Sequence, residues 1–138
     1  MFFQTFDGPT CFPLPADIAG SYISSGAVIT IKNAPDLKVG DYLYNAALNE
    51  IKKVLAFITD NTLSIESAFS SNVTEYVNIK IASRDKVYTS ASISNAGGGI
   101  GYLNEEEVAI GQTVDIKEGE IYFTVDGTGT KISVLAQP

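Results

Sequence analysis

The sequence contains no histidine and no tryptophan, and its single cysteine is Cys11. Histidine is the commonest general base near neutral pH and the commonest metal ligand, so its absence removes the usual acid–base and zinc chemistry. One cysteine cannot form a disulfide within the chain, and the cysteine pairs of structural zinc sites are also missing. We therefore expect a protein that is not an enzyme and that holds no metal or other cofactor.

Positive charge is scarce as well. Lysine and arginine together number 9 against 16 acidic residues, which gives a formal net charge of −7. Binding to nucleic acid or to an anionic membrane surface requires a basic surface, so we expect neither as a partner. The densest apolar run, VLAFI at residues 54–58, is far shorter than the roughly 20 residues that a membrane-spanning helix needs.

The residues that are abundant follow the pattern of β-strands. Apolar residues alternate with polar ones at residues 27–32 (AVITIK), 75–82 (EYVNIKIA) and 120–125 (EIYFTV). Strict alternation of this kind is typical of strands with one buried face. Turn-forming residues at 33–36, 59–62 and 126–129 separate the strands, and we interpret the last two groups as hairpins. The sequence therefore predicts an all-β fold, either a small β-barrel or a β-sandwich.

One segment is ambiguous between helix and strand. Residues 46–56 (AALNEIKKVLA) contain good helix formers, and Ile51, Val54, Leu55 and Ile58 have helical spacing. The alternative is a turn at residues 46–49 followed by a strand that enters the hairpin at residues 59–62. We favour the strand because the segment runs directly into that hairpin.

The first 20 residues combine prolines with phenylalanines. Proline fixes φ and removes a backbone donor, so this segment is expected to be an extended arm rather than a regular element. Its phenylalanines should be buried, either on a neighbouring subunit or along the chain's own barrel. The expected organisation is an arm at residues 1–20, a barrel-like unit at 21–83 and a second β-rich unit at 84–138 packed on it, unless the whole is one single domain.

The glycine-rich stretch NAGGGIGYL, residues 95–103, superficially suggests a phosphate-binding loop. A dinucleotide loop needs a further glycine where this chain has Asn104, and Glu105, Glu106 and Glu107 would then repel a phosphate. We interpret the glycines as a bend or a close approach between strands.

Aromatic residues provide the positive functional signal. Seven tyrosines and seven phenylalanines are a generous supply for a β-protein of 138 residues, and tyrosine is favoured at protein interfaces, although ordinary strand packing also uses it. The candidate interface residues are Phe2, Phe3, Phe6, Phe12, Tyr22, Tyr42 and Tyr44.

A resemblance to a known class of proteins rests on residues 39–69. The segments VGDYLY (39–44), IKKV (51–54), DNTLSI (60–65) and AF (68–69) are similar to a small β-barrel module in virion structural proteins of tailed bacteriophages. The resemblance covers roughly residues 26–83. It implies a capsid decoration or head-auxiliary protein that is assembled in the host cytoplasm and located in the virion. Its partners would be the major capsid protein or neighbouring head proteins, and it would be present in many copies or as a homo-oligomer.

Three functions remain open at this point. The first is a non-enzymatic virion protein that binds an assembled shell through protein–protein contacts. The second is a carbohydrate-binding β module whose exposed tyrosines stack on sugar rings, as in surface adhesion. The third is a hydrolase that uses two facing carboxylates and therefore needs no histidine.

Overall fold

The computed structural model describes residues 1–117 and 119–138, and within these residues every regular element is a β-strand. The expected all-β fold is therefore confirmed. The chain forms two compact units, one made of residues 1–14 and 83–138 and the other of residues 15–82. In the described part of the chain there is no helix of the length and apolar character required to cross a membrane.

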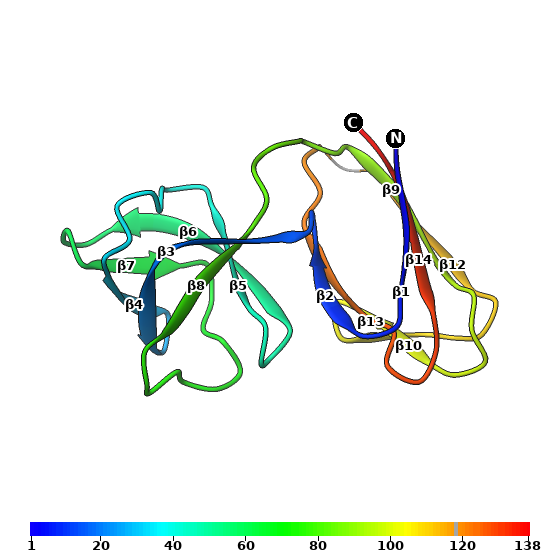
Figure 1. Cartoon of the computed structure of the whole chain (residues 1–138), viewed down its shortest axis with the longest axis horizontal. Coiled ribbons are helices and arrows are strands. Elements are labelled where there is room, and N and C mark those ends of the chain that lie inside the picture. Colours follow the sequence, from blue (N-terminus) through cyan, green and yellow to red (C-terminus); the bar gives the residue numbers. More distant parts are fainter. Residues whose placement is uncertain (118) are drawn as a thin grey trace. The chain divides into compact units, whose positions relative to one another are not determined.

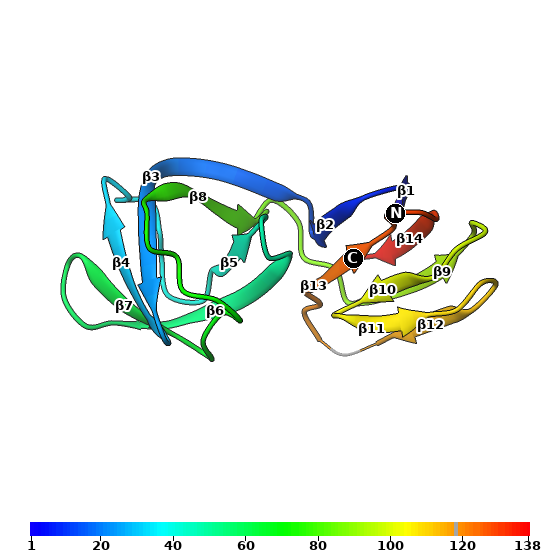
Figure 2. The same cartoon turned by 90° about the horizontal axis from the view of Figure 1, so that it is seen from below.

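Residues 15–82 form a closed six-stranded antiparallel barrel with the strand order β3-β4-β7-β6-β5-β8 (Figure 2). Its strands are β3 (Pro15–Ser25), β4 (Val28–Lys32), β5 (Tyr42–Asn45), β6 (Glu50–Phe57), β7 (Thr62–Ile65) and β8 (Val77–Ala82). Closure leaves no free edge, because every strand has a hydrogen-bonded neighbour on both sides. The barrel has its own apolar core, to which Ile29, Leu43, Val54, Leu63 and Ile79 contribute fully buried side chains.

The alternating runs in this unit bury the faces that their pattern predicts. Ile29 and Ile31 of β4 are buried, as are Ile79 and Ile81 of β8, while Val77 at the start of β8 remains exposed. The ambiguous segment at residues 46–56 is a turn followed by strand β6, so the strand interpretation is confirmed. Pairing of β6 with β7 places this strand in the hairpin, and that cross-strand pairing outweighs the helix-forming composition.

The other unit is a sandwich of two four-stranded sheets with the orders β1-β14-β9-β12 and β11-β10-β13-β2 (Figure 1). Its strands are β1 (Phe2–Phe6), β2 (Pro9–Phe12), β9 (Ser90–Asn95), β10 (Gly101–Leu103), β11 (Glu106–Val108), β12 (Thr113–Ile116), β13 (Phe123–Asp126) and β14 (Ile132–Gln137). The inward faces of both sheets supply a second core that includes Phe12, Ile93, Val108, Phe123, Ile132 and Val134. The barrel is thus inserted into the sandwich sequence between β2 and β9.

The first residues of the chain are not an arm separate from the two units. Phe2–Phe6 pair with β14 in continuous antiparallel register, and Pro9–Phe12 pair with β13. Pro9 does not prevent the pairing of β2, because it is the first residue of an edge strand, which needs hydrogen bonds on one side only. Of the two ways to bury the phenylalanines, the chain uses packing against its own core.

The domain boundaries consequently differ from the expected ones. The expected arm at residues 1–20 is divided between the sandwich and β3 of the barrel, and the unit expected at 84–138 needs residues 1–14 to complete both of its sheets. The period-two pattern predicts strands such as β4 and β8, but it does not detect β1 and β2, and it does not show which strands pair across more than a hundred residues.

The turn at residues 126–129 is also not a hairpin. β13 pairs with β10 and β2, whereas β14 pairs with β1 and β9, so this turn carries the chain from one sheet of the sandwich to the other. Its local geometry is still that of a tight turn, since the Asp126 carboxylate accepts hydrogen bonds from both the backbone and the hydroxyl of Thr128.

The glycine-rich stretch connects β9 to β10 and provides close backbone approach, as the sequence predicts. A Cβ on Gly97 would lie 2.4 Å from Thr130 Oγ1, and one on Gly99 would lie 2.4 Å from the carbonyl oxygen of Gly129. Larger side chains at these positions would separate the loop from the strand connection beside it.

Candidate interaction site

Three of the seven candidate interface residues are core residues. Phe12, Tyr22 and Tyr44 are 1%, 1% and 3% exposed, so their rings pack inside their own units and are not available to a partner. Phe2, Phe6 and Tyr42 are half-buried. Phe3, by contrast, is 64% exposed. The aromatic supply that suggested an interface therefore serves mainly the two cores.

The buried phenylalanines of the N-terminal strands meet in an aromatic cluster of the sandwich. The Phe12 ring lies 5.0 Å from Phe2, 4.9 Å from Tyr88 and 5.2 Å from Phe123 between ring centroids. These separations are in the favourable range for aromatic pairs, and they fix β1 and β2 to the rest of this unit.

The two buried tyrosines of the barrel are hydrogen-bonded through their hydroxyl groups. Tyr44 Oη donates to Asn49 Oδ1 at 2.6 Å. Burial raises the pKa of Tyr22 to about 12, while its hydrogen bond with the Asn45 side chain acts in the opposite direction. The Tyr22 phenol is therefore neutral at physiological pH, and both tyrosines are structural groups of the barrel.

Phe3 lies on the outer face of the sheet β1-β14-β9-β12, where it forms an exposed apolar pair with a neighbouring strand. Phe3 is directly opposite Leu135 of β14, and Leu135 is itself 37% exposed. The row beside this pair is polar and uncharged: Thr5, Ser133, Ser94 and Thr113 follow one another across all four strands. Their hydroxyls bond in two pairs, Thr5 with Ser133 and Ser94 with Thr113, each at 2.9 Å.

The four edge strands of the sandwich differ in how they are protected against pairing with another chain. Natural proteins block free edges with charge, proline or bulges. β2 begins with Pro9, β11 contains Glu106 and Glu107, and β12 contains Asp115. β1, with the sequence FFQTF, contains neither a charged residue nor a proline, and its pairing with β14 has no register shift.

The β1 edge is therefore the surface of the sandwich best suited to accept another strand. Phe2 and Phe6 face the core side, opposite the buried residues Ala136 and Ile132, while Gln4 between them is exposed. The backbone groups of β1 that point away from β14 have no partner strand in this sheet. We call β1 together with Leu135 the β1 edge.

The barrel contains a separate cleft of about 300 Å³. Its lining combines apolar and amide side chains, with Tyr22, Tyr44, Leu48, Val73, Asn45, Asn72, Asn78 and Lys80 among them. Two of these amides already hold the walls in place: Asn45 Oδ1 accepts from Leu48 N at 3.0 Å, and Asn72 Oδ1 accepts from Gly26 N at 3.0 Å. Of the described residues that line the cleft, none carries a carboxylate.

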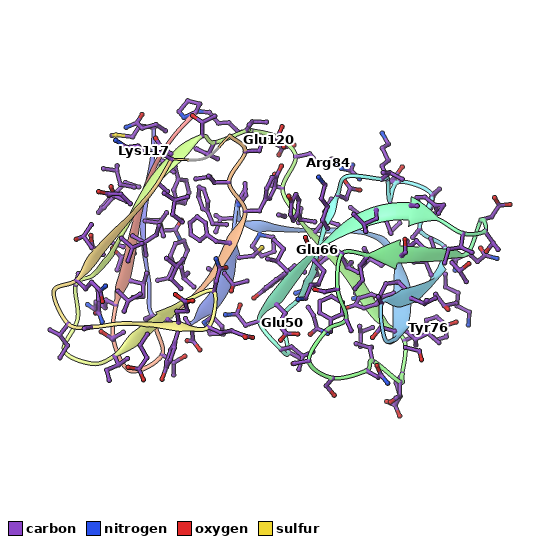
Figure 3. The ribbon with its side chains drawn as sticks, turned by 180° about the vertical axis from the view of Figure 1, so that it is seen from behind. Glu50, Glu66, Tyr76, Arg84, Lys117 and Glu120 are labelled. Carbon is purple, nitrogen blue, oxygen red and sulfur yellow. The ribbon has the colours of Figure 1, made fainter. Side chains whose placement is uncertain are left out.

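The buried carboxylates of the barrel have structural partners. Asp41 Oδ2 accepts from Lys38 N at 2.8 Å, and Glu50 Oε1 accepts from Ser70 N at 2.8 Å. Glu50 is labelled in Figure 3, together with the exposed Tyr76, whose ring is covered by Lys32 Nζ at 4.4 Å. The backbone hydrogen bonds that Asp41 and Glu50 accept indicate that both carboxylates support loops of the barrel.

Cys11 is fully buried in β2, where its thiol lies 3.3 Å from the carbonyl oxygen of Pro13 and donates to it. Burial raises the pKa of this thiol to about 12, so it is not a thiolate near neutral pH. Over residues 1–117 and 119–138, no group of three or more metal-ligating side chains comes together.

Sequence reasoning selected Phe3 but missed Leu135, its neighbour. Nothing near Leu135 in the sequence distinguishes it from other strand residues, because its importance comes from the register with β1. The absence of charge in FFQTF was visible in the sequence, but it acquires meaning only once β1 is known to be an edge strand.

No protein-family model, no curated protein and no solved structure matches this chain.

Proposed function

We propose that this chain is a non-enzymatic structural protein that acts by binding other protein subunits, as a decoration or auxiliary subunit on the head shell of a bacteriophage virion. Its partners would be the major capsid protein, neighbouring head proteins or further copies of itself. The resemblance of residues 26–83 to virion structural proteins supports the virion assignment, and the β1 edge supports the mode of action.

The β1 edge is the observation that carries this proposal. An uncharged, regular edge strand with exposed backbone groups is a template for a strand of another chain. Phe3, 64% exposed, and Leu135, 37% exposed, lie side by side on the outer face of that sheet. Burying a phenylalanine side chain stabilises an interface by roughly 1.5–3 kcal/mol. This pair can therefore add appreciably to an interface formed by backbone hydrogen bonds between strands.

Particle association tests the proposal. Virions are purified by density gradient from the phage or prophage-carrying strain that encodes the chain, and its peptides are sought by mass spectrometry. The wild-type chain should be found in the gradient fraction that contains the particles. The variant Thr5→Lys, which puts a charge into the β1 edge, should be absent from that fraction. Thr113→Lys is the matched control, because Thr113 occupies the same row at the opposite edge of the sheet. Absence of the wild-type chain from particles would overturn the virion assignment.

The alternative function is carbohydrate binding in the barrel cleft, which the combination of tyrosine and asparagine in its lining favours. Against it, Tyr22 and Tyr44 are buried to 1% and 3% exposure and offer no open ring face on which a sugar can stack. A glycan array with wild type and Asn78→Ala decides the matter: saturable binding that the variant loses would establish the alternative.

A further inference from the structure

We propose that the partner of the β1 edge is a second copy of this chain, and that the two β1 strands pair antiparallel about a twofold axis at Gln4. This inference rests on the proposed function, since it names one subunit that the β1 edge binds. The pairing would join two four-stranded sheets into one continuous eight-stranded sheet across the dimer.

The register follows from the length of the strand. A twofold axis at the centre of Phe2–Phe6 places Gln4 opposite Gln4 of the second copy and lets all five residues pair. Phe2 then faces Phe6 of the other copy, and Phe3 faces Thr5. Any other twofold register leaves residues at one end of each strand unpaired, so the central one forms the most hydrogen bonds.

The side chains of β1 are complementary to themselves in this register. On the core side, Phe2 and Phe6 of opposite copies form two aromatic pairs, and aromatic pairs are among the favourable cross-strand combinations. The two Gln4 side chains face each other on the axis, where their amides can bond. On the outer side, Phe3 lies diagonally from Phe3 of the second copy, within reach of an aromatic ring, and Leu135 flanks each of them.

Charge also favours a second copy at this strand. The chain carries a net charge of −7, so most of its surface repels another copy, but β1 contains no charged residue. The nearest acid, Asp7, would lie opposite Met1 rather than opposite Asp7 of the second copy. The β1 edge is thus an uncharged surface through which two acidic chains can approach.

The size of the surface sets the expected strength. Stable interfaces bury about 1,200 Å² or more in total, which is more than the edge of one five-residue strand presents. We therefore expect a micromolar or weaker dimer in solution. Because each chain has one β1 edge and the opposite edge of the sheet contains Asp115, association should stop at two copies.

Sedimentation of the full-length chain over a concentration series provides the first test. Wild type should shift from monomer to dimer with rising concentration, and Thr5→Lys should remain monomeric at every concentration. Thr113→Lys should dimerise like wild type, because it makes the same change on β12, the strand at the opposite edge of the same sheet. A monomeric wild type up to millimolar concentration would overturn the proposal, as would a dimer that Thr5→Lys leaves intact.

Cross-linking tests the register. Opposed residues in an antiparallel pair have Cα atoms about 4.5–5.5 Å apart, a distance that a disulfide can bridge. Gln4→Cys should therefore form a covalent dimer on mild oxidation, whereas Thr113→Cys should not. The native Cys11 is buried and does not interfere. A dimer that Gln4→Cys fails to trap would overturn the pairing about Gln4.

The two proposals fail in different ways. Wild type could be monomeric while Thr5→Lys loses particle association and Thr113→Lys keeps it. In that case the β1 edge binds another virion protein, and self-pairing is wrong. If wild type dimerises and is trapped through Gln4→Cys but is absent from virions, self-pairing stands and the virion assignment is wrong.

Discussion

Asn95 allows a quantitative test of the reasoning about the sandwich. This residue ends β9, is 2% exposed and uses both ends of its side-chain amide. Its Nδ2 donates to the carbonyl oxygens of Gly99 and Val108, each at 2.8 Å, and its Oδ1 accepts from Gly97 N at 3.2 Å and from Thr130 Oγ1 at 2.7 Å. One side chain thereby fixes the glycine-rich loop, β11 and the turn before β14.

The informative substitution is Asn95→Asp, which keeps the shape of the side chain and replaces the two N–H donors of Nδ2 with an acceptor oxygen. The buried carbonyl oxygen of Val108 and the partly buried one of Gly99 would lose their donor and face a carboxylate instead. Leaving a buried polar group unsatisfied costs about 1–3 kcal/mol, and a partly buried one costs less. Together with a poorly solvated charge, the two losses should lower the free energy of unfolding by about 2–4 kcal/mol at neutral pH. An effect of that size is a large part of the stability of a small domain.

The cost should depend on pH with a defined sign. The folded state disfavours the charged form of the carboxyl group that this substitution introduces, so the pKa of that group should be raised above the ordinary aspartate value of about 3.9. The cost is therefore smallest below about pH 4, where both folded and unfolded chains are protonated and the acid can donate one hydrogen bond. It should grow as the pH rises from there to the raised pKa of the folded state, and then remain constant.

Urea unfolding at pH 4 and pH 7, followed by circular dichroism and tyrosine fluorescence, measures both effects. Asn104→Asp is the matched control, since Asn104 lies in the same unit and its Oδ1 only accepts, from Thr124 N at 3.0 Å. That variant should change stability by no more than about 0.5 kcal/mol. If Asn95→Asp is no more destabilising than Asn104→Asp at pH 7, the buried amide does not hold the loop as described.

Further predictions follow from the two-unit organisation and the buried groups. Deleting residues 1–14 should unfold the sandwich, because it removes a strand from each sheet, whereas residues 15–82 expressed alone should give a cooperatively folding barrel; circular dichroism and limited proteolysis distinguish the two. The contribution of the buried, neutral Cys11 thiol to the stability of the sandwich should be fully present below about pH 9, where the thiol is protonated in both folded and unfolded chains. It should be lost as the pH rises toward about 12, the pKa of this thiol in the folded chain. In alkaline denaturation, Cys11→Ala should therefore show a smaller loss of stability over this pH range. Gly97→Ala should lower the melting temperature, since its Cβ would lie 2.4 Å from Thr130 Oγ1, while Gly98→Ala, with no atom within 4 Å, should leave it unchanged.

The candidate site was only partly predictable. The sequence identified Phe3 among seven aromatic candidates, but exposure separated Phe3 from Phe12, Tyr22 and Tyr44, and burial depends on strands that are distant in sequence. Hydrophobicity alone cannot distinguish an aromatic residue that fills a core from one that binds a partner. The lack of charge and proline in β1 likewise becomes informative only with the sheet order, because charge on a strand opposes pairing with another chain only when that strand lies at an edge.

By itself, the sequence determined the all-β class, the strand at residues 50–57 and the close approach of the glycine-rich loop. Each of these follows from local chemistry: alternation gives a strand one buried face, a tight hairpin joins neighbouring strands, and glycine alone fits where a backbone lies within contact distance. The tertiary structure decided that residues 1–14 complete a sandwich with residues 83–138, and that the turn at 126–129 joins two sheets rather than two paired strands. Those choices depend on which apolar faces bury one another across most of the chain, and period-two alternation is the same for every possible partner.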